Sequence, residues 1–199
     1  MKRIVLASGN PGKIREIGAL LAPLAIEVVP QSKLGISEAD EPHDTFLDNA
    51  LAKARHASRA SGLPALADDS GLSVDALGGA PGVHSAYYAG HEGNREQRDA
   101  RNNAKLLASL KDDRTAHYTC VIVFLEHLQK TPLVAEGIWR GEIAREPRGS
   151  NGFGYDPLFF LEEFRKTAAE LDPEVKNRVS HRGIALAKLL ELLRDPSRA

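Results

Sequence analysis

Apolar positions along the chain repeat with two different periods, and the period predicts which element each stretch forms. Four stretches show the three- and four-residue spacing of a helix buried on one face, namely residues 14–24, 45–61, 95–110 and 182–193. Short apolar or alternating runs predict strands at residues 4–7, 26–29, 65–67, 72–74, 117–126, 133–143 and 158–161. Helices alternate with strands early in the chain, whereas two long strands follow one another late. The pattern therefore predicts an α/β fold with a mixed β-sheet flanked by helices.

Composition narrows the class of protein. The chain has 199 residues, of which 42% are hydrophobic and 27% charged, as expected of an ordered domain with a sizeable core. The net charge of −1 gives no support for sequence-independent binding to nucleic acid. The single cysteine, Cys120, excludes an intramolecular disulfide and a multi-cysteine zinc site, and its apolar neighbours predict a packed strand residue. We find neither a membrane-spanning run nor a signal peptide, and expect a cytoplasmic protein with no membrane partner.

The first predicted strand leads into a helix through a tight turn with the sequence Ser8-Gly9-Asn10-Pro11-Gly12-Lys13. Such a turn aims unpaired backbone N–H groups, the positive end of the helix dipole and the Lys13 ammonium at one point, which suits a phosphate. It is not a P-loop, because Gly9 stands only three residues before Gly12 and Ile14 follows the lysine where that motif needs Ser or Thr. The alternative is an ordinary turn with a solvated lysine.

Two adjacent carboxylates, Asp68 and Asp69, end a short apolar run and precede Ser70 and Gly71, which we predict to close a turn. Neighbouring side chains on an extended backbone point to opposite sides, so the two carboxylates need not do the same job. Either one is a candidate ligand for a hard cation such as Mg²⁺. Glu41, placed before a proline that favours extended backbone, is the best additional candidate ligand. The alternative is an Asp-Ser turn that hydrogen-bonds its own backbone.

A helix and a glycine-rich loop carry further candidate residues. Asn49 and Lys53 share one face of the helix predicted over residues 45–61. Such polar side chains are usually exposed, whereas an inward Lys53 would contact phosphate. Glycines on both sides of Phe153 let a flat ligand approach, and its ring offers a stacking surface for a base. Asp156 is a candidate for hydrogen bonds to the base edge. The alternative is a hairpin loop whose aromatic residues pack on the core.

The last helix is preceded by the basic segment that contains Lys176, His181 and Arg182. His181 and Arg182 are predicted to lie in the first turn of that helix, where positive charge opposes the dipole, so a nearby anion would rationalise them. The alternative is a solvated face. Residues 91–103, rich in charges and amides, are predicted to form a solvated loop and helix face, and residues 112–114 a turn. We assign no chemistry to either stretch.

Six segments, taken together and in order, resemble the non-canonical purine nucleoside triphosphate pyrophosphatases, the inosine/xanthosine triphosphate pyrophosphatase family. They are Ser8-Gly9-Asn10 with Lys13, Thr45-Phe46 with Asn49-Ala50 and Lys53-Ala54, Ala67-Asp68-Asp69-Ser70-Gly71, Gly79-Ala80-Pro81-Gly82 with Ser85-Ala86, Gly152-Phe153-Gly154-Tyr155-Asp156-Pro157, and Ser180-His181-Arg182. The resemblance covers nearly the whole chain. It implies a single domain over residues 1–199, with an elongated mixed sheet and two lobes around a central substrate cleft, usually in a homodimer.

The resemblance also implies an activity and a role for each matching residue. The enzyme would hydrolyse dITP, ITP and XTP to the monophosphate and pyrophosphate with Mg²⁺, or Mn²⁺ as a substitute, and so keep them out of nucleic acids. Asp69 would be the catalytic acid/base, and Glu41 and Asp69 would hold the metal. Substrate would be bound by Ser8, Gly9, Asn10, Pro11, Gly12, Lys13, Lys53, Ser70, Phe153, Gly154, Tyr155, Asp156, Lys176, His181 and Arg182. Two departures are Asp48, where the family more often has glutamate, and Arg165, where glycine is frequent.

Three other functions remain open on sequence alone. The chain could be a pyrophosphatase for pyrimidine or modified nucleotides with the same metal chemistry. It could be a regulatory module that binds a nucleotide without turnover. A single-strand nucleic-acid binder that uses Phe153 for stacking is the third, and the net charge of −1 weakens it.

Overall fold

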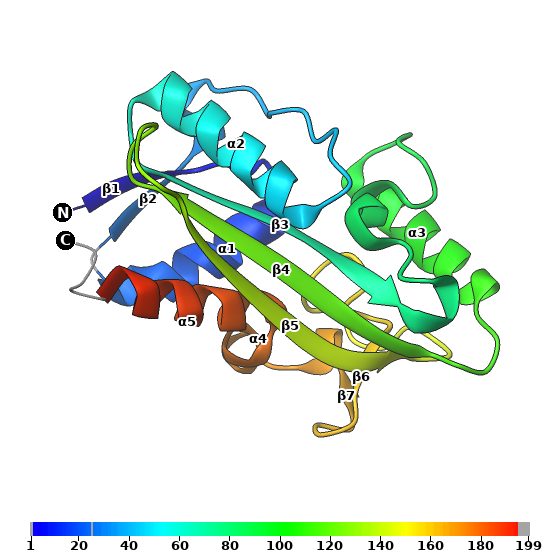
Figure 1. Ribbon diagram of the computed structural model, residues 1–199. Helices are drawn as coiled ribbons and strands as arrows, with labels where there is room; N and C mark the ends of the chain where they lie inside the picture. The colour runs from blue at the N-terminus through cyan, green and yellow to red at the C-terminus, as the bar shows by residue number, and fades with distance from the viewer. Residues whose placement is uncertain (1, 25, 195–199) are drawn as a thin grey trace. The chain divides into compact units, whose positions relative to one another are not determined.

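The computed structural model describes residues 2–24 and 26–194, and within them the strands form one sheet of seven in the order β2-β1-β3-β4-β5-β6-β7 (Figure 1). Strand β1 (Lys2–Leu6) pairs in parallel with β2 (Ile26–Pro30) and β3 (Ala65–Val74). Next in order come β4 (Thr115–Leu125) and β5 (Leu133–Ile143), followed by the antiparallel β6 (Phe159–Leu161) and β7 (Lys166–Thr167). The predicted mixed sheet is confirmed.

The chain divides into two compact units. Unit 1 comprises Met1–Asp69, Cys120–Gly137 and His181–Ala199, and unit 2 comprises Ser70–Thr119 and Ile138–Ser180. Each unit has apolar clusters of its own. We therefore describe the two units separately.

Alternation along the strands of unit 1 produces two apolar layers. On one face, helices α1 (Pro11–Leu21) and α5 (His181–Arg194) cover the sheet, and on the other face lies α2 (Phe46–Ser61) (Figure 1). The α1/α5 layer contains Ile4, Leu6, Ile17, Leu21, Leu66, Cys120, Ile122, Ala185, Leu186 and Leu189. The α2 layer contains Val5, Ala7, Ala50, Ala54, Ala57, Ala65, Ala67, Val121, Val123 and Leu125. Successive residues of β1, β3 and β4 thus belong to opposite layers, as the two-residue period of a strand requires.

Unit 2 is built around an aromatic cluster and two helices, α3 (Arg95–Ser109) and α4 (Pro173–Val179). The ring centroid of Phe159 lies 4.7 Å from that of Tyr118 and 5.1 Å from that of Trp139. Short 3-10 segments occur at η3 (Asp75–Leu77), η4 (Gly82–Tyr87) and η5 (Ala168–Glu170), and in unit 1 at η1 (Ala22–Leu24) and η2 (Gln31–Leu34). The sequence pattern missed α4 and β7, which are too short to show a period.

Strand β3 corrects one sequence-based prediction. We expected two strands separated by a turn that Gly71 closes, but a single strand runs through this residue. A Cβ atom on Gly71 would lie 2.2 Å from the carbonyl oxygen of Gly82 and 2.6 Å from the Oγ of Ser85. Glycine is required here because another segment approaches the strand closely, not because the chain turns.

The backbone conformation of Arg165 explains why glycine is frequent at this position in the family. Among the described residues Arg165 is the sole non-glycine with a positive φ, at 54°. This left-handed conformation costs a residue with a Cβ atom about 1–2 kcal/mol, whereas glycine adopts it without that penalty. The frequent glycine at this position therefore has a backbone reason.

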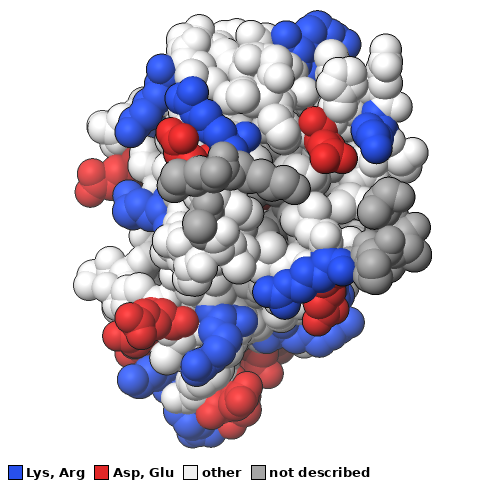
Figure 2. All heavy atoms as spheres, turned by 90° about the vertical axis from the view of Figure 1, so that its left-hand side faces the viewer, with Lys and Arg blue, Asp and Glu red and all other residues white. Residues whose placement is uncertain are grey.

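One face of the molecule carries mixed charge. On the face drawn in Figure 2, Lys and Arg side chains lie among Asp and Glu side chains. This face therefore does not present the continuous basic stripe that is typical of a nucleic-acid interface. Within residues 2–24 and 26–194, we find no helix with the length and apolar character needed to cross a membrane.

Candidate active site

The turn at residues 8–13 lies between β1 and α1, and Asn10 caps the helix. The Oδ1 atom of Asn10 accepts hydrogen bonds from the N–H groups of Gly12 at 2.9 Å and Lys13 at 3.3 Å, while the Asn10 N–H donates to the Ser8 Oγ at 3.2 Å. Two of the N–H groups that we expected to be unpaired are therefore satisfied by the cap, since the first turn of a helix lacks backbone partners. Lys13 is the remaining cationic group of this turn.

Asp68 lies on β3 and faces the layer formed by α1 and α5. Its Oδ2 atom is 2.9 Å from the Nζ of Lys13 and 3.3 Å from the Nη2 of Arg182. Arg182, only 1% exposed, forms a second ion pair with Glu16 of α1. We name Lys13, Glu16, Asp68 and Arg182 the buried ion cluster. Burial by itself would raise the pKa of Asp68, but the charges of Lys13 and Arg182 hold this pKa well below its ordinary value of 3.8.

Asp69 follows on β3 and faces α2. Its Oδ1 atom accepts a hydrogen bond from the Nζ of Lys53 at 3.0 Å, and its Oδ2 atom accepts one from the Nδ2 of Asn49 at 3.3 Å. Lys53 also forms an ion pair with Glu41. We name Glu41, Asn49, Lys53 and Asp69 the α2-side ion cluster. Burial raises the pKa of Asp69 despite the opposing charge of Lys53, whereas Asp69 and Glu41 raise the pKa of Lys53 against the effect of its own burial.

The two carboxylates thus point to opposite sides of one strand, as the extended geometry predicted. Asp68 has two cationic partners and a lowered pKa. Asp69 shares one cation with Glu41 and has a raised pKa. A carboxylate with a raised pKa is the better proton acceptor near neutral pH.

The α2-side ion cluster has the donor chemistry of a divalent cation site. The carboxylates of Glu41 and Asp69 both contact the ammonium group of Lys53, so their oxygens converge on one cationic centre. Carboxylate oxygens are the ligands that Mg²⁺ prefers, and this ion usually keeps several waters and adds substrate phosphates. In the part of the chain that the structure describes, no group of three or more His, Cys, Asp and Glu side chains is arranged to hold a metal. The residues present therefore fit a metal held by two carboxylates and completed by oxygens from elsewhere.

In unit 2, the loop around Phe153 is held by a buried ion pair. The Oδ2 atom of Asp156 accepts hydrogen bonds from the Phe153 N–H at 2.8 Å and from the Nζ of Lys176 at 2.6 Å. The same ammonium lies 5.1 Å from the centroid of the Phe153 ring. Gly152 has a φ of 77°, and a Cβ atom there would lie 2.1 Å from the Asp156 Oδ2. The loop is therefore built to hold a half-buried aromatic ring beside a cation and a carboxylate.

The other predicted site residues have different surroundings. Tyr155 is buried in the core of unit 2, where its hydroxyl donates to the Ser85 carbonyl at 2.8 Å and burial raises its pKa. Ser70 is half-buried on β3 and begins unit 2. His181 is buried at the start of α5 in unit 1. The anions expected beside Arg182 include two carboxylates of the protein itself, those of Asp68 and Glu16.

Sequence reasoning missed the polar face of α3. Asn102 is 2% exposed, and its side chain accepts from the Ala89 N–H at 2.7 Å and donates to the carbonyls of Ser85 and Ala86. Nearby on the same helix, Asp99 contacts the loop around Phe153. Charged and amide residues at helical spacing are usually solvated, so no local pattern distinguishes this face from an ordinary surface.

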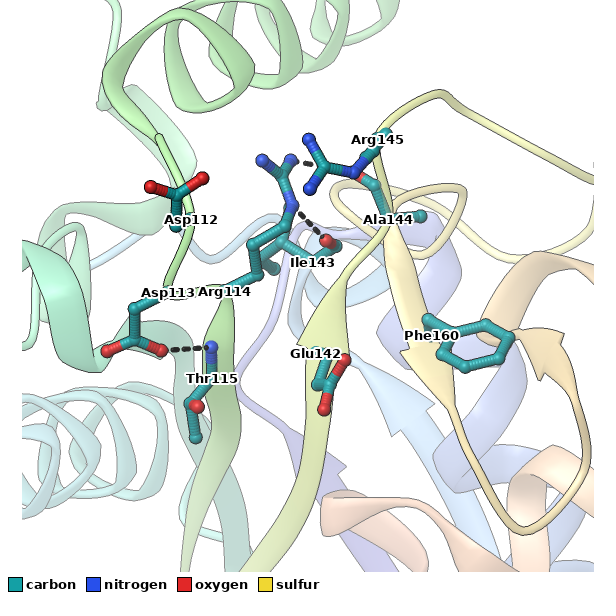
Figure 3. Close-up of a pocket in the computed structure, with 9 residues that line it drawn as sticks. All are labelled: Asp112, Asp113, Arg114, Thr115, Glu142, Ile143, Ala144, Arg145 and Phe160. Atoms are coloured by element: carbon teal, nitrogen blue, oxygen red, sulfur yellow. Dashed lines mark hydrogen bonds between the residues drawn. The ribbon is translucent and has the colours of Figure 1, made fainter.

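A pocket of about 400 Å³ lies elsewhere in unit 2 (Figure 3). Its lining comprises Asp112, Asp113, Arg114, Thr115, Glu142, Ile143, Ala144, Arg145 and Phe160, which include none of the predicted site residues. The guanidinium of Arg114 donates to the carbonyl of Ala144 at 2.8 Å and to that of Ile143, while partial burial and the neighbouring Arg145 lower the pKa of Arg114. Arg114 therefore ties the segment before β4 to the end of β5.

Comparison with known proteins identifies relatives over the whole described fold. The model of the Ham1 family matches residues 4–192. A dITP/XTP pyrophosphatase of Nitrosomonas europaea is 61% identical over 98% of this chain and 96% of its own length, and one of Neisseria meningitidis is 57% identical over 96% of each. The structure of a HAM1 protein from Coxiella burnetii is 48% identical, with a TM-score of 0.86 over 97% of this chain and 98% of that one.

A second solved structure is also similar to this chain in sequence and in fold. A nucleoside-triphosphatase described as a dITP/XTP pyrophosphatase from Mycobacterium abscessus is 44% identical, with a TM-score of 0.71 over 96% of this chain and 100% of that chain. Similarity at this level and extent shows that these solved structures share the fold of this chain. The chain belongs to the Ham1 family.

Proposed function

We propose that this chain is a nucleoside triphosphate pyrophosphatase that hydrolyses dITP, ITP and XTP. It cleaves the bond between the α and β phosphates and releases the nucleoside monophosphate and pyrophosphate, which prevents incorporation of these nucleotides into nucleic acids. Membership of the Ham1 family and relatives named dITP/XTP pyrophosphatase, at about 60% identity over nearly their full length, support this activity. Within the structure, the observation that carries it is the convergence of the Asp69 and Glu41 carboxylates on the Nζ of Lys53.

Asp69 acts as the general base in this proposal. Its Oδ1 atom lies 3.0 Å from the Nζ of Lys53, which holds the carboxylate in place to accept a proton from the attacking water. Asn49 donates to one oxygen of Asp69 at 3.3 Å and so restricts the rotation of the carboxyl group. The proton of the water passes to Asp69 as the water oxygen bonds to phosphorus and pyrophosphate leaves.

Glu41 and Asp69 are the residues that would hold Mg²⁺, with Mn²⁺ as a possible substitute. When bound, the cation offsets negative charge on the triphosphate. Lys53 and Lys13 supply fixed positive charge for the phosphate oxygens, together with Arg182 and the groups of the turn at residues 8–13. We also propose that Ser70 contacts the substrate, since it directly follows Asp69 in the chain.

In unit 2, we assign base recognition to the loop around Phe153. Stacking of a base on an aromatic ring contributes about 1–3 kcal/mol and tolerates any base, so selectivity needs polar contacts to the base edge. Asp156, Lys176 and the main chain at Tyr155 are the groups of this loop that we assign to these contacts, and we assign to Gly154 the close approach of the base to the ring. His181 is a separate proposed substrate contact. We also propose that residues 1–199 form a single pyrophosphatase domain.

We further propose a cytoplasmic homodimer whose partners are free nucleotides rather than nucleic acid or membrane. The sequence resemblance supports the dimer, and the net charge of −1 gives no support for sequence-independent binding to nucleic acid. Size-exclusion chromatography with light scattering measures the oligomeric state directly. A monomer at micromolar concentration would contradict the dimer without affecting the proposed reaction.

The test of the reaction is hydrolysis of ITP, dITP and XTP beside ATP and GTP in Mg²⁺, with the products identified by ³¹P NMR in ¹⁸O-labelled water. We expect IMP and pyrophosphate from ITP, the label in IMP because water attacks the α phosphorus, and little reaction with ATP or GTP. Release of orthophosphate would show that the bond is wrongly assigned. Tight binding of ITP without turnover would instead support the regulatory module.

A further inference from the structure

The loop that carries Phe153 is held by a helix far from it in the sequence. The Gly154 N–H donates to the Oδ2 of Asp99 at 3.0 Å, and the Gly154 carbonyl accepts from the Nδ2 of Asn103 at 3.0 Å. Asp99 and Asn103 are one helical turn apart on α3, so they share a face. We name these two residues the α3 clamp. Both main-chain polar groups of one loop residue thus bind one helix, within unit 2.

The α3 clamp completes the fixation of the Phe153 backbone. Its φ and ψ are determined by the orientations of the peptide planes on its two sides, because each plane is rigid. Asp156 holds the preceding plane through the Phe153 N–H at 2.8 Å, and Asp99 holds the following plane through the Gly154 N–H at 3.0 Å. The flanking residues are glycines at φ 77° and 64°, which offer little resistance to reorientation. The direction of the Phe153 side chain therefore depends on both carboxylates.

Asp99 also orients a cation over the same ring. The Nε of Arg95 lies 3.7 Å from the Oδ2 of Asp99, and its Cζ lies 5.2 Å from the centroid of the Phe153 ring. This distance is within the range of a cation–π interaction. Arg95, Asp99 and Asn103 thus form a single stripe on α3 whose contacts all lead to Phe153 and Gly154.

We propose that Asp99 and Asn103 are positioning residues that set the orientation of Phe153 and thereby control the affinity for the base. The inference rests on the proposed role of Phe153 in base stacking. Neither residue touches a group to which we assign phosphate chemistry, so the clamp acts on KM and on base selectivity and leaves kcat nearly unchanged.

The first test compares Asp99→Ala with Asp99→Asn in the hydrolysis of ITP. Removing the acceptor raises KM about tenfold, equivalent to about 1.4 kcal/mol, with kcat within about twofold of wild type. Asn retains an oxygen that accepts the Gly154 N–H, so Asp99→Asn keeps KM within about threefold of wild type. Glu96→Ala, which removes a carboxylate from the same helix, is the matched control and leaves both constants unchanged.

A double-mutant cycle with Phe153→Ala separates positioning from general destabilisation. If Asp99 acts through the ring, Asp99→Ala raises KM no further once Phe153 is removed, because the two effects are coupled. If Asp99→Ala raises KM equally in both backgrounds, it acts independently of Phe153, and the proposal is wrong. The same cycle with Asn103→Ala tests the second half of the clamp.

Two outcomes separate the clamp from the function on which it rests. If Phe153→Ala leaves the KM for ITP unchanged, the stacking role of Phe153 is wrong. If Phe153→Ala raises KM but Asp99→Ala does not, only the clamp is wrong. Hydrogen exchange of the Gly154 amide, followed by NMR, is independent of activity: we expect Asp99→Ala to abolish its protection, and retained protection would overturn the clamp.

Discussion

The buried ion cluster and the α2-side ion cluster contain adjacent aspartates of β3 that differ in their ion-pair partners and in the direction of their pKa shifts. In the former, Asp68 has ion pairs with Lys13 and Arg182, and Arg182 pairs again with Glu16. In the latter, Asp69 shares the ammonium of Lys53 with Glu41. The pKa of Asp68 is depressed, whereas that of Asp69 is raised.

The difference shows how one strand separates a structural carboxylate from a chemically reactive one. Two neighbouring cations stabilise the ionised form of a buried carboxylate. The resulting ion pairs connect the helices that carry the cations. A carboxylate whose burial is incompletely compensated keeps a higher affinity for protons and for an added cation. We therefore expect substitutions at Asp68 to affect stability most strongly and substitutions at Asp69 to affect catalysis.

Asp69→Asn is expected to have the largest effect. The amide preserves the shape of the side chain but cannot accept the proton of water, so kcat for ITP falls about a thousandfold, within the range for loss of a general base. Steady-state hydrolysis measures the change, and circular dichroism confirms the fold. Retention of more than about a tenth of the wild-type kcat would show that Asp69 is not the base.

Asp68→Asn comes next, with an effect on folding. Loss of this charge leaves the buried Arg182 with Glu16 and deprives Lys13 of its partner, so the free energy of unfolding falls by about 3 kcal/mol. Urea denaturation of wild type and variant measures this difference. Unchanged stability, together with a large loss of kcat, would reverse the roles that we give to the two carboxylates.

Glu41→Gln is expected to have a smaller effect, which is a weaker affinity for Mg²⁺. The concentration of Mg²⁺ required for half-maximal activity rises about tenfold, the loss typical even of residues that only support a metal ligand. Titration of activity with Mg²⁺ at fixed ITP gives this value. Asp40→Asn, in the adjacent exposed residue, is the control, and an equal shift in that variant would indicate a general charge effect.

The smallest expected effect is on the pH dependence of the free energy of unfolding, to which the two carboxylates contribute with opposite signs. It is measured in the metal-free protein, in the presence of a chelator. The depressed pKa of Asp68 stabilises the fold above the ordinary value of 3.8, and this contribution is lost as pH falls through the folded pKa. The raised pKa of Asp69 changes stability with pH in the opposite direction. Protonation of Asp69 favours the folded protein, and this contribution is lost as pH rises through the folded pKa.

Urea denaturation at several pH values tests both signs. Wild type is more stable than Asp68→Asn at pH 7 and loses this advantage in acid. It is less stable than Asp69→Asn at pH 7, and that deficit also disappears in acid. Differences of the same sign for both variants would contradict the contrast between the clusters.

Much of the fold was predictable because strand and helix periods are local. The bounds predicted for the strand at residues 133–143 are those of β5, and all four predicted helices are present with shifted ends. The turn expected at Gly71 was wrong because a glycine that permits close approach has the same local sequence as one that closes a turn. The solvated face expected over residues 91–103 was wrong in part, since Asn102 is buried.

The family motifs, the mixed sheet and the opposite directions of Asp68 and Asp69 follow from residue identity and from the two-residue period of a strand, both of which are local. The partners of each carboxylate depend instead on contacts between distant parts of the chain. Arg182 reaches Asp68 across 114 positions of the chain, and Asp99 reaches Gly154 across 55. Such pairings depend on how helices pack on a sheet, and no local pattern specifies them. Packing thus gave two identical neighbouring side chains different proton affinities.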